Sequence, residues 1–160
     1  PQLIKAAGVK DLLSIGLITA IPFGVGAVAM VANGAHSDRT RERRWHAAIA
    51  ALFGAGGIVA SALLGADQTA LSVIALTIGT AGIVSTFPVF WPIPSQFLGG
   101  AGAAAGIALI NSLGNLAGFV SPFMVGFVRD VTGSTDVGMY TLGAILVIGA
   151  LLVLNARRGE

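Results

Sequence analysis

Two polar residues within a long apolar stretch of this chain have a spacing that could hold a small ligand. Asn111 and Asn115 are four residues apart, so on a helix their side chains share one face. A buried amide needs hydrogen-bond partners, so these amides either bond to neighbouring helices or donate N–H groups to a ligand. Ser112 lies about 100° further around the same helix and is a weaker candidate. Ser85 and Thr86 either line the same cavity or bond back to their own helix.

Other residue types that carry chemistry are scarce. The chain has no cysteine, which excludes a thiol nucleophile, a disulfide and a cysteine metal site. It contains no Gly-x-Ser-x-Gly motif and no pair of carboxylates placed for acid–base catalysis. The two histidines, His36 and His46, lie at the edges of the apolar stretches. We therefore expect neither an enzyme nor a metal or cofactor site.

The elements that position these residues must lie in a membrane. The stretch from Gln68 to Val128 contains no charged side chain, and a charge at the centre of a bilayer costs about 2.5–3.5 kcal/mol on insertion scales. Only 10% of all residues are charged, against about 25% in a soluble domain. The sequence therefore predicts an integral membrane protein with the lipid bilayer as its partner. The net charge of +2 does not indicate a nucleic acid partner, because the basic residues lie in short clusters between apolar stretches.

A helix needs about 20 apolar residues to cross a bilayer, and the chain has five such stretches. They lack the alternation of β-barrel strands, so we predict an all-α membrane bundle. A turn is expected where Pro92 and Pro94 cluster, because proline interrupts helices. Two Gly-x-x-x-Gly repeats, starting at Gly102 and Gly114, predict close packing of the fourth span. The predicted spans are about 12–33, 46–65, 70–92, 98–127 and 137–156.

The distribution of basic residues predicts which side faces the cytoplasm. The more basic side is expected there, which also places the C-terminus in the cytoplasm. An odd number of spans and a first residue that is not methionine favour a fragment that follows at least one earlier helix. The more basic side holds Arg39, Arg41, Arg43, Arg44, Arg157 and Arg158, and the other side holds Lys5, Lys10 and Arg129.

The segment 34–46 is expected to be a cytoplasmic loop with a specific motif, formed by Gly34, Asp38, Arg39, Arg43 and Arg44. This motif resembles the loop Gly-x-x-x-Asp-Arg-x-Gly-x-Arg-Arg of the major facilitator superfamily, although Arg41 stands where glycine is usual. In that superfamily the loop latches the cytoplasmic ends of the two halves of a carrier. The resemblance therefore implies a conformational latch in which Asp38 accepts from Arg39 and Arg43. The alternative is a plain signal for membrane topology.

Two further segments resemble one branch of the superfamily, the anion:cation symporters. They are residues 87–95, which begin Phe-Pro-Val-Phe-Trp-Pro, and residues 106–122, which contain both asparagines. The branch includes bacterial permeases for tartrate, galactonate, hexuronates and phthalate. The resemblance covers nearly the whole chain, as spans eight to twelve of a twelve-span fold. It implies a multi-pass protein of the plasma membrane, which in bacteria is the inner membrane.

The same resemblance implies a secondary active transporter that moves a small organic anion, a sugar acid or dicarboxylate, together with protons by alternating access. Asn111 and Asn115 would then donate to the carboxylate or hydroxyls of a sugar acid. The charged groups of such carriers sit mainly in the N-terminal half, so the implied partners are that half, the anion and the proton. The alternatives are a drug or sugar exporter of the same superfamily and a non-transporting membrane sensor or assembly subunit.

Aromatic residues crowd the end of the third predicted span. Phe87, Phe90 and Trp91 lie beside Pro88 and Pro92, and each proline frees a backbone carbonyl and bends a helix. One interpretation is a helix end with a tryptophan at the membrane interface. The other is an inner gate whose rings close the transport pathway.

Overall fold

The computed structural model describes residues 10–64 and 68–156, and the regular elements in these ranges are all helices. Five segments are long and apolar enough to cross a membrane, which confirms the all-α fold with five such helices. The helices are α2 (Leu12–Thr40), α3 (Arg44–Leu64), α4 (Thr69–Ser85), α5 (Phe87–Phe90), α6 (Pro92–Phe97), α7 (Gly100–Thr132) and α8 (Asp136–Asn155), and α4, α5 and α6 together make the third segment.

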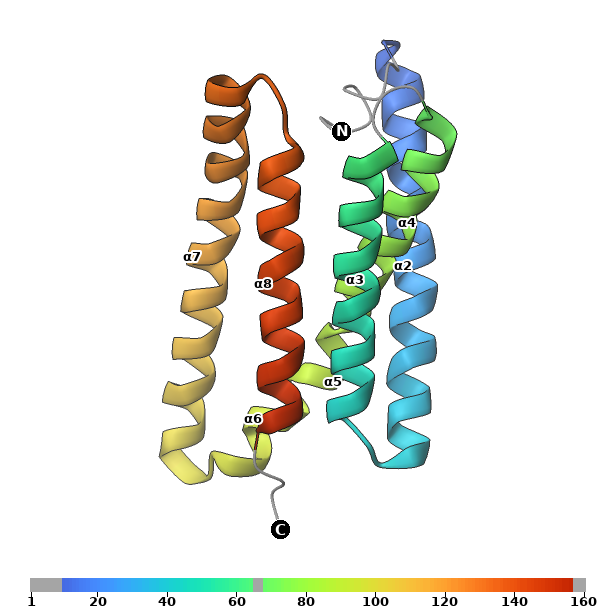
Figure 1. Ribbon diagram of the computed structural model, residues 1–160. Coiled ribbons are helices and arrows are strands. Elements are labelled where there is room, and N and C mark those ends of the chain that lie inside the picture. The colour runs from blue at the N-terminus through green and yellow to red at the C-terminus, as the bar shows by residue number, and fades with distance from the viewer. Residues whose placement is uncertain (1–9, 65–67, 157–160) are drawn as a thin grey trace.

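The long helices run side by side with α3 at the centre (Figure 1). α3 packs against α4 and against α8, and α2 packs against α4. The short helices α5 and α6 lead the chain from α4 across to α7, at the end of the bundle where α8 also ends. α7 lies at the outer edge beside α8, and none of its membrane-spanning stretch is buried. The described core is therefore formed by α2, α3, α4 and α8.

Glycines set the closest helix contact in the bundle, between α3 and α4. A Cβ atom added to Gly57 would overlap the backbone of Gly79, and one added to Gly82 would overlap the backbone of Gly54. Residues three apart share a helix face, so each helix presents a pair of glycines to the other. In a membrane, small residues let helix backbones approach and gain van der Waals contact. A buried hydrogen bond of 2.8 Å between the hydroxyls of Ser61 and Ser72 joins the same two helices.

The close packing predicted for the fourth span is not seen among the described helices and stays a prediction. Gly102, Gly114 and Gly118 of α7 have open space where a Cβ atom would be. Gly106 alone of the four meets another residue, the side chain of Leu98. The pattern on α7 looked like a contact face because its spacing is correct, but the described helices leave most of α7 without a neighbour.

One correction concerns the predicted loop 34–46. α2 continues to Thr40 and α3 begins at Arg44, so residues 41–43 alone connect them. Arg41 has a left-handed φ of 53°, and its N–H donates to the carbonyl of Ser37. Helices often end in this way, usually at a glycine. The helix lasts this long because no proline or glycine follows Gly34 before Arg41.

A second correction concerns the turn expected at Pro92 and Pro94. Pro92 begins α6, where proline is tolerated because the first N–H groups of a helix have no internal partner. The chain turns instead at Leu98 and Gly99, which are extended, and at Gly100, which has a φ of +57°. The fourth helix then runs past the predicted 98–127 as far as Thr132. The predicted end of the second span, residue 65, lies outside the described residues.

The basic residues gather as predicted where the structure describes them. Arg41, Arg43 and Arg44 lie where α2 ends and α3 begins, beside the last turn of α8, and we call this the basic end. Lys10 and Arg129 lie at the opposite end of the bundle (Figure 1). The predicted group members Lys5, Arg157 and Arg158 lie outside the described residues. That the basic end faces the cytoplasm stays a prediction.

Candidate latch, gate and binding residues

The connection between α2 and α3 is held by a small polar cluster. Ser37 is fully buried, and its Oγ donates to the carbonyl of Glu42 at 2.6 Å. Arg43 donates from Nη1 to Ser37 Oγ at 3.2 Å, and its Nη2 lies 2.5 Å from Oδ1 of Asp38. The guanidinium group therefore bridges two acceptors on the last turns of α2, as its forked geometry allows. The structure brings Asp38 and Arg43 together, and their role as a latch stays a prediction.

Arg44 and Arg39 differ in what they contact. Arg44 donates from Nε to the carbonyl of Val153 at 3.1 Å. This carbonyl belongs to the last turn of α8, where the free carbonyls and the helix dipole favour a cation. Arg44 therefore joins the start of α3 to the end of α8. Arg39 is exposed and makes no ion pair with any residue in the described ranges, so the predicted pairing of Arg39 with Asp38 is not present.

Gly34 connects the predicted latch with the predicted gate. It is buried in α2, and a Cβ atom at this position would lie 3.3 Å from Cβ of Pro88 in α5. That separation is tighter than an ordinary contact, so a side chain here would push Pro88 outward. The last part of α2 therefore packs closely against α5.

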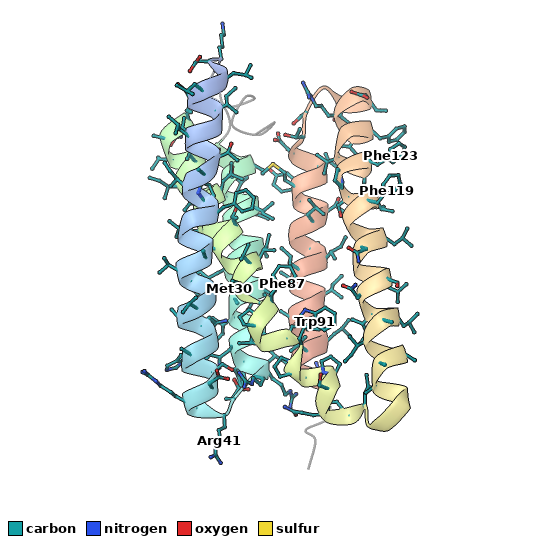
Figure 2. The ribbon with its side chains drawn as sticks, turned by 180° about the vertical axis from the view of Figure 1, so that it is seen from behind. Met30, Arg41, Phe87, Trp91, Phe119 and Phe123 are labelled. Carbon is teal, nitrogen blue, oxygen red and sulfur yellow. The ribbon has the colours of Figure 1, made fainter. Side chains whose placement is uncertain are left out.

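The predicted gate residues lie on and beside α5. Phe90 and Trp91 form an edge-to-face pair, with ring centroids 5.6 Å apart and planes at 71°. Such a pair is a favourable aromatic geometry. Phe87 is half exposed, and Figure 2 shows Phe87 and Trp91 in the half of the bundle nearer to Arg41. Val89 between them is fully buried and anchors the segment in a core cluster with Ala47 and Ile93.

The predicted binding residues do not come together. Asn111, Ser112 and Asn115 are exposed on α7, and Nδ2 of Asn115 donates to the carbonyl of Asn111 at 3.0 Å. Ser85 and Thr86 lie at the end of α4 and donate to carbonyls of their own helix, at 2.9 and 2.7 Å. α7 packs against α8 and α6 rather than against α4. The described residues therefore do not form the common cavity that the sequence predicts, and the binding role of these five residues stays a prediction.

The uncovered side of α7 carries large apolar side chains in addition to the asparagines. Phe119 and Phe123 point away from α8 in Figure 2, and their side chains are 73% and 69% exposed. They lie one and two helical turns beyond Asn115. This face is therefore suited to contact lipid or further protein rather than water.

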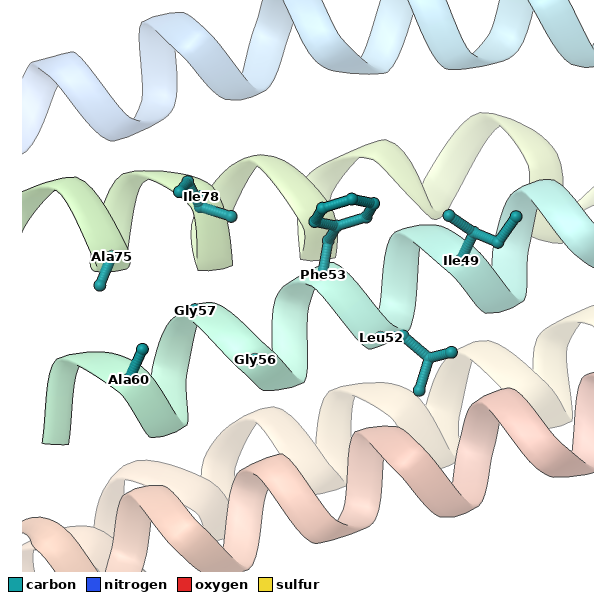
Figure 3. Close-up of a pocket in the computed structure, with 8 residues that line it drawn as sticks. All are labelled: Ile49, Leu52, Phe53, Gly56, Gly57, Ala60, Ala75 and Ile78. Atoms are coloured by element: carbon teal, nitrogen blue, oxygen red, sulfur yellow. The ribbon is translucent and has the colours of Figure 1, made fainter. Parts of the chain in front are cut away.

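Two grooves run along the helices in the described part of the chain. One, of about 410 Å³, lies between α3 and α4 and is lined by Ile49, Leu52, Phe53, Gly56, Gly57, Ala60, Ala75 and Ile78 (Figure 3). A second, of about 530 Å³, lies among α2, α3 and α4. Its polar lining includes Asn33, His36 and Ser85, and Nδ2 of Asn33 donates to the carbonyl of Ser85 at 2.9 Å. Ser85 thus lines a groove, but not one that contains the asparagines of α7.

Two histidines at the basic end contact each other, which the sequence alone did not predict. Nδ1 of His36 lies 2.7 Å from Nε2 of His46, and Nδ1 of His46 lies 2.9 Å from Oε2 of Glu42. The sequence contains one indication of this contact: His36 and His46 are equally far from Arg41, where the chain reverses. Antiparallel helices bring such positions side by side.

Glu42 also holds the start of α3. Its carboxylate accepts the backbone N–H of Trp45 at 2.9 Å and of His46 at 3.2 Å, which have no partner inside the helix. Burial opposes the charged form, but the hydrogen bonds from Trp45 and His46 outweigh it and lower the pKa of Glu42. Glu42 is therefore the anionic end of a chain of three hydrogen-bonded groups.

Similar proteins carry the names of transporters. Over its full length the chain is 46% identical to a putative tartrate transporter of Agrobacterium vitis and covers 35% of that protein. Over 96% of its length it is 38% identical to the putative metabolite transport protein NicT of Pseudomonas putida, covering 35%. Over 95% of its length it is 35% identical to a quinolone resistance transporter of Acinetobacter baumannii, also covering 35%. The chain thus spans about a third of the length of the curated relatives it matches. No model of a known protein family matches the chain, and no solved structure matches it.

Proposed function

This chain belongs to the anion:cation symporter branch of the major facilitator superfamily, and we propose that it is part of a secondary transporter that moves a small organic anion together with protons. The observation that carries the proposal is the similarity to tartrate transporters along the whole chain. The five helices that could cross a membrane support it, because alternating access requires such a bundle. Because the chain spans about a third of its relatives, the substrate and the coupling ion are properties of the longer carrier.

We assign the five helices to spans eight to twelve of a twelve-span carrier in the plasma membrane, which is the inner membrane of a bacterium. The N-terminal half of that carrier is then the partner that covers the open side of the bundle. The basic end faces the cytoplasm, because basic residues are enriched in cytoplasmic connections. The end of α8 lies on the same side, and we propose a cytoplasmic C-terminus accordingly.

The latch acts through the contacts at the basic end. Arg43 holds Asp38 and Ser37 together and so fixes the angle between α2 and α3. Gly34 transmits the position of α2 to Pro88 and hence to the aromatic pair Phe90 and Trp91. A rocking movement of α2 would therefore open or close the aromatic segment. This coupling favours the gate interpretation over a plain helix end.

The asparagines of α7 are proposed to face the transport pathway. Their helix is not covered by the other described helices, so this face is free to meet the rest of a longer carrier. The side chain of Asn111 makes no hydrogen bond within the described residues, and Asn115 uses one of its two N–H donors. Both amides thus retain donors for the carboxylate or hydroxyls of a sugar acid or dicarboxylate.

Uptake by the full-length protein in proteoliposomes tests the function. Labelled sugar acids and dicarboxylates, tartrate among them, would be offered with and without an imposed pH gradient. Accumulation of one acid that depends on the gradient supports the proposal and identifies the substrate. Absence of accumulation for every acid overturns it.

Drug export is the second candidate, and the similarity to a quinolone resistance transporter favours it specifically. The apolar grooves beside α3 would suit a flat aromatic compound better than a sugar acid. Lower quinolone accumulation in cells that express the full-length protein, without uptake of any acid, would replace the symporter proposal with this one.

A further inference from the structure

We propose that His36, His46 and Glu42 form a proton relay between the groove among α2, α3 and α4 and the aqueous phase at the basic end. This inference rests on the proposed proton-coupled transport and names the residues through which the proton leaves. The three groups form one chain of hydrogen bonds, 2.7 Å between the rings and 2.9 Å between His46 and Glu42. The relay joins two helices, because His36 belongs to α2 and His46 to α3.

The hydrogen bonds fix the tautomers in a definite order. The carboxylate of Glu42 can only accept, so Nδ1 of His46 carries the proton between them. Nε2 of a neutral His46 is then an acceptor, and Nδ1 of His36 must donate to it. Nε2 of His36 is left with a lone pair. In its resting state the pair therefore has one free basic nitrogen, on the ring that lines the groove.

A proton that reaches this nitrogen can be passed on without movement of either ring. An N–H bond forms at Nε2 of His36, the N–H bond at Nδ1 of His36 breaks, and a new N–H bond forms at Nε2 of His46. His36 ends neutral in its other tautomer, and His46 ends as an imidazolium next to the carboxylate of Glu42. An adjacent carboxylate stabilises an imidazolium. The Nδ1 proton of His46 then passes by way of the Glu42 carboxylate to water, which leaves each ring neutral with its proton on Nε2. Exchange of the ring protons with water returns both rings to their first tautomers and completes the cycle.

Glu42 is the charged group that contacts the histidine pair in the described part of the chain. Arg43 is held by Asp38 and Ser37, and Arg44 is held by the end of α8. α4 and α5 have no ionisable side chain in their described residues, and the two of α8, Asp136 and Tyr140, belong to its first two turns, at the opposite end. The other ionisable groups near the basic end are Arg39 and Arg41, which are exposed.

The two ends of the relay lie in different surroundings. The His46 side chain is 15% exposed, and the Glu42 side chain is 35% exposed. Glu42 lies in the connection between the helices, outside the apolar stretches, whereas His36 lines a groove that is otherwise mostly apolar. His36 is itself exposed, so the relay joins this groove to a carboxylate that is also partly exposed, and the more buried His46 lies between them.

The test uses the full-length protein in proteoliposomes, with tartrate as the probe acid and pyranine inside the vesicles as the pH indicator. In His36→Gln and His46→Gln, a side chain of similar length still forms hydrogen bonds but cannot take up a proton. We expect inward acidification driven by tartrate to fall at least tenfold in both variants. Exchange of labelled for unlabelled tartrate, which needs no net proton release, should stay within twofold of the wild-type protein.

Ala35→Gln is the matched control, because it places the same side chain on an exposed neighbouring position of α2. It should leave both acidification and exchange unchanged. A second measurement needs no transport: nitrogen NMR of labelled histidine rings across a pH titration. If the rings share a proton, His46→Gln should shift the tautomer signals and the titration of His36.

The outcomes separate the relay from the proposed function. Independent titration of the two rings, or normal acidification in His36→Gln, would overturn the relay while proton-coupled transport stands. If the wild-type protein exchanges tartrate but never acidifies the lumen, proton coupling is wrong and the relay falls with it. Loss of exchange as well as acidification in both variants would also overturn it, because the rings would then be structural.

Discussion

Gly57 of α3 lies so close to Gly79 of α4 that no side chain atom fits between the two backbones. Gly54 and Gly82 repeat this relationship one turn away. The contact between these helices is therefore made by main-chain atoms, in the part of the bundle where α3 also packs against α8. The described core depends on this close approach, because α3 packs against both α4 and α8.

Gly57→Ala should destabilise the protein. The added methyl group would overlap Gly79, and overpacking of a fixed contact costs about 1–3 kcal/mol. We expect a lower midpoint of thermal unfolding for the full-length protein in detergent. Gly56→Ala is the matched control on the same helix, since a Cβ atom there meets nothing within 4 Å. Equal midpoints for the two variants would show that the helices do not approach as closely as described.

Arg41→Gly should stabilise the protein. Arg41 holds a φ of 53°, and a left-handed conformation costs a residue other than glycine about 1–2 kcal/mol. Glycine removes that strain, although it adds disorder to the unfolded chain, so we expect a small rise in the unfolding midpoint. Arg39→Gly removes the same charge from within α2 and should lower the midpoint instead, since glycine disfavours helix by about 1 kcal/mol. The same sign for both changes would contradict the left-handed turn.

Asp38→Asn should slow transport without unfolding the protein. The Asp38 side chain is 65% exposed, and exposed ion pairs contribute about 0–1 kcal/mol, so stability should change little. Loss of the Arg43 pairing should nevertheless shift the balance between inward-facing and outward-facing states. Cysteine reporters on the opposite face would measure that shift by their reaction rate with a membrane-impermeant thiol reagent.

A double variant that exchanges the two charges, Asp38→Arg with Arg43→Asp, is a second test of the same ion pair. If the ion pair acts as a latch, the double variant should recover part of the transport rate that either single variant loses. Equal reporter accessibility in the wild-type protein and Asp38→Asn would remove the latch and leave these residues as topology signals.

Stability should depend on the ionisation of Glu42. Its pKa lies below the ordinary value of 4.5 because backbone N–H groups and His46 bond to the carboxylate. A carboxylate with a lowered pKa contributes stability that is complete above its ordinary value and is lost as the pH falls through the folded value. The unfolding midpoint of the wild-type protein should therefore drop below about pH 4.5.

In Glu42→Gln this part of the pH dependence should be absent, so the midpoints of the two proteins should converge as the pH is lowered. Asp130→Asn, which removes an exposed carboxylate of α7, is the control and should follow the wild-type curve. Parallel curves for wild-type protein and Glu42→Gln would contradict the bonding described at the start of α3.

Asn115→Ala in the full-length protein should abolish uptake while the amount of protein in the membrane is unchanged. The reason is loss of an amide donor to the transported acid. Ser112→Ala, one helical position after Asn111 and on a different face, should have a weaker effect. Unchanged uptake and apparent affinity in Asn115→Ala would remove this residue from the site and leave its bond to Asn111 as a local feature of α7.

The membrane-spanning segments were predictable because charge and apolar length decide them, and each depends on one stretch of sequence. The residues at which the helices begin and end were harder to predict. Pro92 predicts a break but lies at a helix start, and Arg41 predicts no turn but forms one. Whether a residue breaks a helix depends on its position in the hydrogen-bond ladder, which composition does not reveal.

Contacts between helices were harder to predict than the helices. The spacing of Gly102 and Gly106 looked like a packing motif, yet Gly57 and Gly79 make the close contact. Small residues permit a close approach between helices, but their spacing does not indicate which neighbouring helix comes close. The asparagines illustrate the same limit, since their partners depend on what covers α7.

The bond between Arg44 and the carbonyl of Val153 spans 109 residues of sequence. At a synthesis rate of about 5–20 residues per second, α3 emerges from the ribosome roughly 5–20 s before the end of α8. During that interval the α8-facing side of α3 and the guanidinium of Arg44 must be accommodated by lipid or by the insertion machinery. Until α8 is made, this side of α3 lacks the helix that covers it, so truncation of α8 should shorten the lifetime of the nascent protein in the cell.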